Sequence, residues 1–106
     1  MTVELDVFSG RPNPTWELDK PGRENLWRLQ SRLNVSSRAY WEPPALGYRG
    51  FLYSDADGGV RAYRGFVRTT RVVLDDPSFT IERYLLSHIP TEFETVRKRI
   101  ASEIGR

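Results

Sequence analysis

Alternating hydrophobic and polar positions predict a strand at the start of the chain. Val3, Leu5 and Val7 occupy every second position, which is the period of a half-buried strand. Residues 9–14 break this pattern, because two prolines fix the backbone and disfavour helix in the residues before them. We expect a rigid turn there, after which residues 15–18 resume an extended path.

Leucines at helical spacing predict the first helix. The apolar stripe consists of Leu26, Leu29 and Leu33. Asp19 is expected to cap this helix, with Pro21 in its first turn, and Asn34 is expected to end it. Residues 36–47 contain two adjacent prolines and no clear period, which indicates a connecting loop.

Two segments rich in aromatic and β-branched residues predict a hairpin. They cover residues 48–54 and 60–68, and the Asp57-Gly58 pair between them is a strong hairpin signal. If these two residues form the turn, Leu52 lies opposite Tyr63. The same register places Phe51 opposite Arg64.

This register divides the second hairpin strand into two faces. One face would carry Arg61, Tyr63, Val67, Thr69 and Arg71, and the other Arg64, Phe66, Arg68 and Thr70. Helices are expected to cover one of the two faces. The other would then present arginines and aromatic rings.

The last third of the chain predicts a short strand and two helices. Residues 72–74 are hydrophobic and partly β-branched, as in a strand. Asp76 and Pro77 form a typical cap and first-turn pair for a helix over residues 79–88. Residues 91–94 match a capping box and would open the last helix.

These elements predict one α+β domain over residues 1–106. Their order is β–α–β–β–(β)–α–α, a mostly antiparallel sheet of three to four strands with about three helices on one face. A chain of 106 residues is an ordinary size for one domain and can bury a core without a disulfide or a metal.

The composition excludes several classes of function. The chain has no cysteine, which removes disulfides, thiolate nucleophiles and cysteine-based metal sites. No apolar run approaches the roughly 20 residues of a membrane span, and the first residues lack the pattern of a signal peptide. We therefore expect a cytoplasmic protein without a membrane partner.

The positive residues are mostly arginines. Of 16 Lys and Arg residues only Lys20 and Lys98 are lysines, so 14 are arginines. Guanidinium groups suit carboxylates, phosphates and aromatic faces better than ammonium groups do, although an arginine bias also arises from genome composition. The net charge of +2 is too small to predict non-specific nucleic-acid binding.

No complete catalytic constellation is present in the sequence. The single histidine, His88, falls near the end of a predicted helix. There the helix dipole would favour its cationic form, which is a structural role. Asp55 and Asp57, followed by Gly58, resemble the first half of a calcium-binding loop, but the remaining ligands of such a loop are missing. Glycine-rich phosphate motifs are absent as well. We expect a protein that is not an enzyme, with no cofactor and no metal; an enzyme based on pocket carboxylates stays an alternative.

Two surfaces are candidate ligand sites. In the first, residues 9–14 hold Arg11 and Asn13 on a proline-stiffened loop, which suits a carboxylate or phosphate. The alternative is that both side chains bond the loop internally. The second surface is the hairpin, with Arg61, Tyr63, Arg64, Phe66 and Arg68. Such a face can hold a peptide or stack bases, but arginines are also ordinary on a solvated sheet.

One segment resembles a known group of proteins. The run LDVFSGRPNPTW, from Leu5 to Trp16, resembles the D-V-F-S-G-R-P-N-P-x-W signature of small bacterial proteins that are largely uncharacterised. Residues 82–86, ERYLL, resemble a weaker phrase of the same group. The chain is also similar to the peptide-binding accessory proteins of crocagin biosynthesis, which act on ribosomally made peptides without catalysing their modification. No binding residues carry over from either group.

The resemblance implies a non-catalytic accessory protein of a bacterial natural-product pathway. It would bind a ribosomally made precursor peptide and present it to a tailoring enzyme, through strand addition at an open sheet edge. A nucleic-acid-binding protein that uses the hairpin face stays an alternative. The sequence does not decide whether the protein is a monomer or forms a homodimer.

Overall fold

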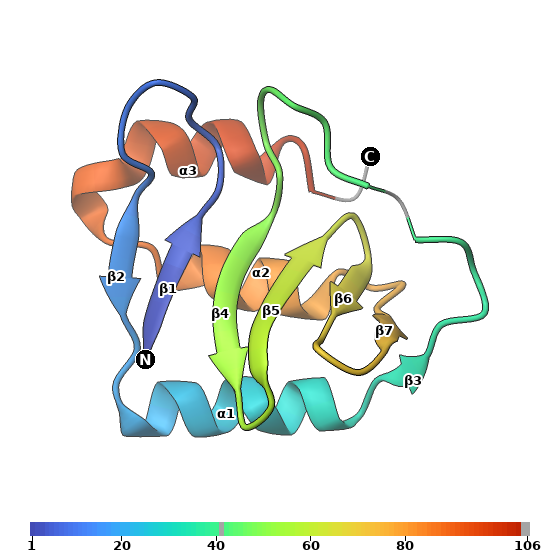
Figure 1. Ribbon diagram of the computed structural model, residues 1–106. Coiled ribbons are helices and arrows are strands. Elements are labelled where there is room, and N and C mark those ends of the chain that lie inside the picture. The colour runs from blue at the N-terminus through green and yellow to red at the C-terminus, as the bar shows by residue number, and fades with distance from the viewer. Residues whose placement is uncertain (41, 105–106) are drawn as a thin grey trace.

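Seven antiparallel strands form one sheet in the part of the chain that this computed structural model describes, residues 1–40 and 42–104 (Figure 1). The strand order across the sheet is β2-β1-β4-β5-β6-β7-β3. The strands are β1 Thr2–Leu5, β2 Thr15–Glu17, β3 Asn34–Val35, β4 Phe51–Asp55, β5 Gly58–Tyr63, β6 Phe66–Arg68 and β7 Val73–Asp75. The helices are α1 Lys20–Ser31, α2 Thr80–Ser87 and α3 Glu94–Ala101, with a 3₁₀ turn over Thr91–Phe93. The predicted α+β class is confirmed.

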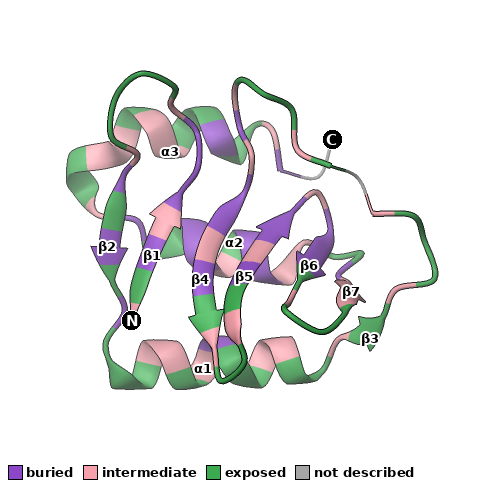
Figure 2. Ribbon diagram, in the orientation of Figure 1, coloured by how far each residue is buried: buried purple, intermediate pink, exposed green. Residues whose placement is uncertain are grey.

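The core lies between the sheet and its helices. Leu5, Phe51 and Ala62 are neighbours across β1, β4 and β5, and all three are completely buried. They belong to one hydrophobic cluster with Ile81 and Leu85 of α2, which runs behind the central strands in Figure 1. Figure 2 shows the complementary pattern, with exposed residues at the β4–β5 turn, on α1 and on β3.

Helix α1 begins where the sequence predicts. The Asp19 carboxylate accepts a hydrogen bond from the Gly22 N–H at 2.8 Å, so Asp19 is the N-cap. The helix ends at Ser31, and Asn34, the predicted stop, instead begins β3. Leu26 of the predicted stripe is fully buried.

Capping at the two C-terminal helices differs from the prediction. The buried Asp76 carboxylate accepts bonds from the N–H groups of Thr80 and Ile81 at 3.0 and 2.9 Å, yet the N-cap residue of α2 is Phe79. Asp76 therefore stabilises this helix end from outside the helix. The capping box over residues 91–94 does not form, because residues 91–93 make a 3₁₀ turn without a side-chain cap.

The predicted count of three to four strands is wrong for two physical reasons. Strands β2 and β3 have three and two residues, too few to show a hydrophobic period. In addition, the predicted strand over residues 60–68 is two strands, because Arg64 and Gly65 have φ values of 50° and 79°. Positive φ at both positions is typical of a two-residue hairpin turn, here with arginine in the place usually taken by asparagine.

The register of the β4–β5 hairpin differs from the prediction by two residues. Phe51 pairs with Ala62 instead of Arg64. Leu52 pairs with Arg61 instead of Tyr63. The turn consists of residues 56–57, because Asp55 pairs with Gly58. The Asp55 carboxylate accepts a bond from the Asp57 N–H at 2.9 Å, and such a local bond stabilises a tight turn.

The predicted division of faces is also wrong. In the β5–β6 hairpin, Arg61 pairs with Arg68 and Tyr63 pairs with Phe66. Because paired residues of antiparallel strands point to the same side of a sheet, these four residues share one face. The sequence interpretation had assigned Arg61 and Arg68 to opposite faces.

None of the helices in residues 1–40 and 42–104 is long and apolar enough to cross a membrane.

Candidate binding surfaces

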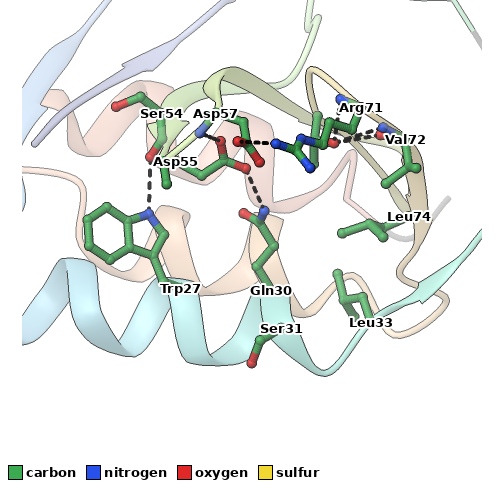
Figure 3. A pocket seen from close by; sticks show the side chains of 12 residues that line it. Trp27, Gln30, Ser31, Leu33, Ser54, Asp55, Asp57, Arg71, Val72 and Leu74 are labelled. Carbon is green, nitrogen blue, oxygen red and sulfur yellow. Dashed lines mark hydrogen bonds and ion pairs between the residues drawn. The ribbon is translucent and has the colours of Figure 1, made fainter.

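An open pocket of about 780 Å³ lies between α1, the β4–β5 turn and the β6–β7 loop (Figure 3). We call it the Trp27 pocket. Its apolar lining comes from Trp27, Leu33, Val72 and Leu74. Its polar lining includes Gln30, Asp55, Asp57, Thr69 and Arg71. A volume of this size is within the range of ligand sites in proteins.

Hydrogen bonds fix the polar wall of the Trp27 pocket. The Trp27 indole N–H donates to the Ser54 carbonyl at 3.1 Å, which ties α1 to β4. Gln30 accepts a bond from the Tyr53 hydroxyl at 2.6 Å. Its amide donates to Asp55 at 3.0 Å (Figure 3). A ligand would therefore meet a preformed wall and would not have to order it.

Exposed hydrophobic side chains gather at this pocket. Among the described residues, four large hydrophobic side chains are exposed: Trp27, Val35, Leu46 and Val72. Trp27 and Val72 line the pocket, and Val35 is the strand partner of Leu74, which also lines it. Exposed apolar side chains that cluster around a pocket are typical of interaction sites.

The edge strand β3 offers unpaired backbone groups beside the same pocket. The Ser36 N–H donates to the Val73 carbonyl at 2.8 Å. Inward and outward groups alternate along an antiparallel edge, so the N–H and C=O of Val35 point away from β7. At the other end of the sheet, β2 is also an edge strand.

A second hollow lies on the opposite face of the sheet, over β4, β5 and β6. Arg61 and Arg68 line both of its parts, one of about 520 Å³ with Leu52 and one of about 260 Å³ with Arg49. We call this surface the arginine groove, after Arg49, Arg61 and Arg68. Thr69 lines both this groove and the Trp27 pocket.

A buried carboxylate organises the arginine groove. Asp6 is 3% exposed and accepts bonds from Arg49 at 2.8 and 3.1 Å and from Arg61 at 2.8 Å. Burial alone would raise the pKa of Asp6, but the hydrogen bonds and positive charges of Arg49 and Arg61 outweigh this effect and lower it. Asp6 therefore stays ionised and holds two guanidinium groups in place.

Aromatic rings support the arginines at the other end of the groove. The Arg68 guanidinium lies 5.3 Å from the centre of the Tyr40 ring, and Arg38 lies 4.3 Å from the centre of the Phe66 ring. The two rings meet edge to face at 5.6 Å. This stack fixes the direction in which Arg68 leaves the sheet.

The five predicted hairpin residues have different environments. Arg61 and Arg68 line the groove. Tyr63 and Phe66 are 2% and 4% exposed and offer little surface to a ligand. Arg64 lies in the β5–β6 turn, where its Nε donates to the Tyr63 hydroxyl at 3.0 Å.

The predicted loop residues Arg11 and Asn13 make contacts within the loop region. Asn13 Oδ1 accepts bonds from the N–H groups of Val7 and Phe8 at 3.0 and 2.7 Å. Its amide donates to the carboxylates of Glu4 and Asp6 at 2.8 and 3.3 Å. The guanidinium of Arg11, an exposed residue, lies 3.7 Å from the centre of the Phe8 ring.

Sequence reasoning missed the Trp27 pocket and the role of Asp6. The pocket joins α1 to two turns that are distant in sequence, and no local pattern signals such a meeting. One signal did exist, because Trp27 adjoins the leucine stripe of α1. Its 38% exposure distinguishes it from a core residue.

Other titratable groups have structural partners. Glu82 is 1% exposed and accepts bonds from the Tyr48 hydroxyl at 2.5 Å and the Gly65 N–H at 2.9 Å. Burial raises the pKa of Glu82, although these bonds oppose the rise. His88 ends α2 with its ring against Tyr84. Within residues 1–40 and 42–104, no group of three or more His, Asp and Glu side chains is placed to hold a metal.

In comparisons with known proteins, no family model matches the chain, and neither a curated protein nor a solved structure shows significant similarity to it. The resemblance of the segment from Leu5 to Trp16 stays a prediction.

Proposed function

We propose that this protein is a non-catalytic peptide-binding protein that holds an extended peptide along β3 and in the Trp27 pocket. The observation that carries the proposal is the meeting of exposed apolar side chains with an unpaired strand edge. Trp27 and Val72 are 38% and 40% exposed at the pocket, and Val35 is 66% exposed at the edge. Side chains and backbone of one short segment could satisfy both features together.

Strand addition explains why a peptide suits this surface. The free N–H and C=O of Val35 can pair with a peptide backbone, which supplies affinity independent of sequence. Side chains of an added strand alternate between two directions, so every second one would point toward the side of β7 that carries Leu74. An apolar residue there would bury surface against the Trp27 pocket and supply specificity.

The proposed ligand is a ribosomally made precursor peptide, which the protein would present to a tailoring enzyme of a bacterial natural-product pathway. The resemblance of the segment from Leu5 to Trp16 supports this choice. An open surface leaves most of a bound peptide accessible, as presentation to a second protein requires.

One observation argues against catalysis by the buried carboxylates, and a second argues against base stacking. The buried carboxylates Glu82 and Asp76 are engaged with a phenol and with backbone N–H groups, and neither lines the Trp27 pocket or the arginine groove. A general base needs contact with its substrate. The buried rings of Tyr63 and Phe66 likewise give little support to base stacking, the basis of the nucleic-acid alternative.

Isothermal titration with the precursor peptide encoded beside the gene tests the proposal. We expect micromolar binding that largely survives added salt, because backbone pairing and apolar burial are insensitive to screening. Val35→Pro removes an outward N–H, and Val72→Asp places a charge at the pocket. Each should weaken binding at least about tenfold, which corresponds to about 1.4 kcal/mol.

The matched control is Val35→Ile, which keeps a β-branched apolar side chain and the backbone N–H. It should bind within about twofold of the parent chain, as suits a conservative change at an exposed site. Absence of binding at either salt concentration, or binding that ignores both Val35→Pro and Val72→Asp, would overturn the proposal. Binding to short single-stranded nucleic acid that falls steeply with salt would support the alternative.

A further inference from the structure

The arginine groove combines cations that ordinary sheet packing would keep apart. Arg61 and Arg68 are direct cross-strand partners on β5 and β6. Like charges in this position destabilise a sheet, and Arg49 adds a third cation to the lining of the same hollow. An anion between the arginines would remove the repulsion.

The described residues supply too little negative charge to neutralise the groove. Asp6 serves both Arg49 and Arg61. Within residues 1–40 and 42–104, Arg68 has one ionic partner, Glu42, at 3.8 Å, and the side chains of Arg68 and Glu42 are 54% and 74% exposed. In the described part of the chain, three cations thus face two carboxylates, and one of these, Glu42, is largely exposed.

The unused donors of Arg61 have the geometry of a carboxylate site. Its Nη1 makes two bonds, to Asp6 and to the Arg49 carbonyl, at 2.8 and 2.7 Å. Among the described residues no acceptor meets its Nε and Nη2, which form one edge of the guanidinium fork. Two parallel N–H groups on that edge match the two oxygens of a carboxylate.

We propose that the arginine groove binds a carboxylate between Arg61 and Arg68, with Glu42 as a weak internal competitor. The Asp6 carboxylate positions Arg61 through a hydrogen bond, and the Tyr40 ring positions Arg68 through contact with its guanidinium. The pyrrolidine rings of Pro43 and Pro44 form an apolar wall beside the charged groups. The ligand class is an organic acid or an acidic peptide group.

For the source of this carboxylate the inference rests on the proposed function. The arginine groove and the Trp27 pocket both include Thr69 in their lining, so one peptide can reach both surfaces. The carboxylate would be the free C-terminus of the bound peptide. This assignment predicts a preference for peptides with a free acid at one end.

The test titrates the ¹⁵N-labelled full chain with sodium glutarate and follows the arginine Nε–Hε resonances by NMR, with sodium chloride holding ionic strength constant. We expect saturable shifts of the Arg61 and Arg68 signals at millimolar glutarate.

Four variants separate the site from general electrostatics. Arg68→Gln should weaken glutarate binding about fivefold or more, and Arg68→Lys should lose most of the affinity although it keeps the charge. Arg99→Gln removes one positive charge from α3 and should stay within about twofold, as expected for a screened, distant charge. Glu42→Gln removes the competitor and should tighten binding.

Shifts that do not saturate, or an equal loss in Arg68→Gln and Arg99→Gln, would each overturn the inference. A pair of precursor peptides that end in a carboxylate or an amide then identifies the source. The free acid should bind several-fold tighter, and equal binding would overturn the peptide assignment. Because the glutarate test needs no peptide and Val35→Pro leaves the groove intact, failure here and failure of the proposed function are distinguishable.

Discussion

Replacing Asp6 by asparagine tests how the arginine groove is held together. The Asp6 carboxylate accepts three bonds from Arg49 and Arg61, at 2.8 to 3.1 Å, and is 3% exposed. Asparagine keeps the size and one acceptor oxygen but turns an NH₂ group toward one of the arginines. Donor then faces donor where a charged hydrogen bond had been.

The expected cost follows from the exposure of the arginines. Losing one hydrogen bond to a charged group costs about 1.5–3 kcal/mol, and breaking a fully buried ion pair costs about 3–5 kcal/mol. The side chains of Arg49 and Arg61 are 35% and 27% exposed, so water recovers part of the loss. We therefore expect Asp6→Asn to lower the free energy of unfolding by about 2 kcal/mol at pH 7.

The pH dependence identifies charge as the cause. The pKa of Asp6 is lower in the folded chain than its ordinary value of 3.8, so its contribution is fully present above pH 3.8 and is lost as pH falls through the folded pKa. Urea unfolding followed by tryptophan fluorescence from pH 7 to pH 2.5 measures this difference. The difference in unfolding free energy between the parent chain and Asp6→Asn should be constant down to about pH 4 and then become smaller.

An exposed ion pair provides the control. Asp57 lies 3.1 Å from Arg71, with side chains 43% and 75% exposed, and Asp57→Asn should cost no more than about 0.5 kcal/mol. Two results would refute the reasoning. One is a cost for Asp6→Asn as small as that of the control; the other is a cost that stays unchanged at the lowest pH, which would assign it to shape.

Three further predictions concern stability and the peptide site. Gly50→Ala should lower the free energy of unfolding by about 3 kcal/mol or more, because φ is 98° and the added Cβ would lie 2.4 Å from the Ala62 carbonyl oxygen. The control is Gly59→Ala, whose Cβ meets nothing within 4 Å. It should change the free energy of unfolding in urea little. Glu82→Gln should change the pH profile of unfolding: since the folded pKa of Glu82 is raised, the parent chain should lose stability relative to the variant as pH rises above 4.5. Trp27→Phe removes the indole N–H that is bonded to Ser54. We expect it to weaken peptide binding, measured by titration, and to lower the free energy of unfolding by about 1 kcal/mol. Unchanged peptide affinity would remove Trp27 from the site.

Local patterns predicted the elements that bury a stripe or carry a cap. The alternation of Val3 and Leu5 and the cap at Asp19 both correspond to observed elements. The short edge strands could not be predicted, since β3 exists only because Asn34 and Val35 find β7 as a partner. The turn at Arg64 was missed because tertiary context imposes a positive φ that arginine does not prefer.

The candidate sites show the same division. Composition left open whether the arginines reflect a ligand or only genome bias, and the hairpin pattern predicts Arg61 and Arg68 as candidate site residues. That they face the same hollow depends on the turn at residues 64–65, which brings β6 back beside β5. The Trp27 pocket depends on the packing of α1 beneath two turns, for which no period or motif in the sequence codes.

The loop segment has a physical role that joins it to the arginine groove. The Asn13 side chain bonds the backbone of Val7 and Phe8 and also the Asp6 carboxylate. Asp6 in turn holds Arg61, one of the two arginines that we assign to the carboxylate site. The loop therefore fixes Asp6 against rotation, and Asp6 fixes the guanidinium fork. Because a fork that is ordered before binding loses less entropy when its ligand arrives, the rigid loop can contribute to affinity without contacting the ligand.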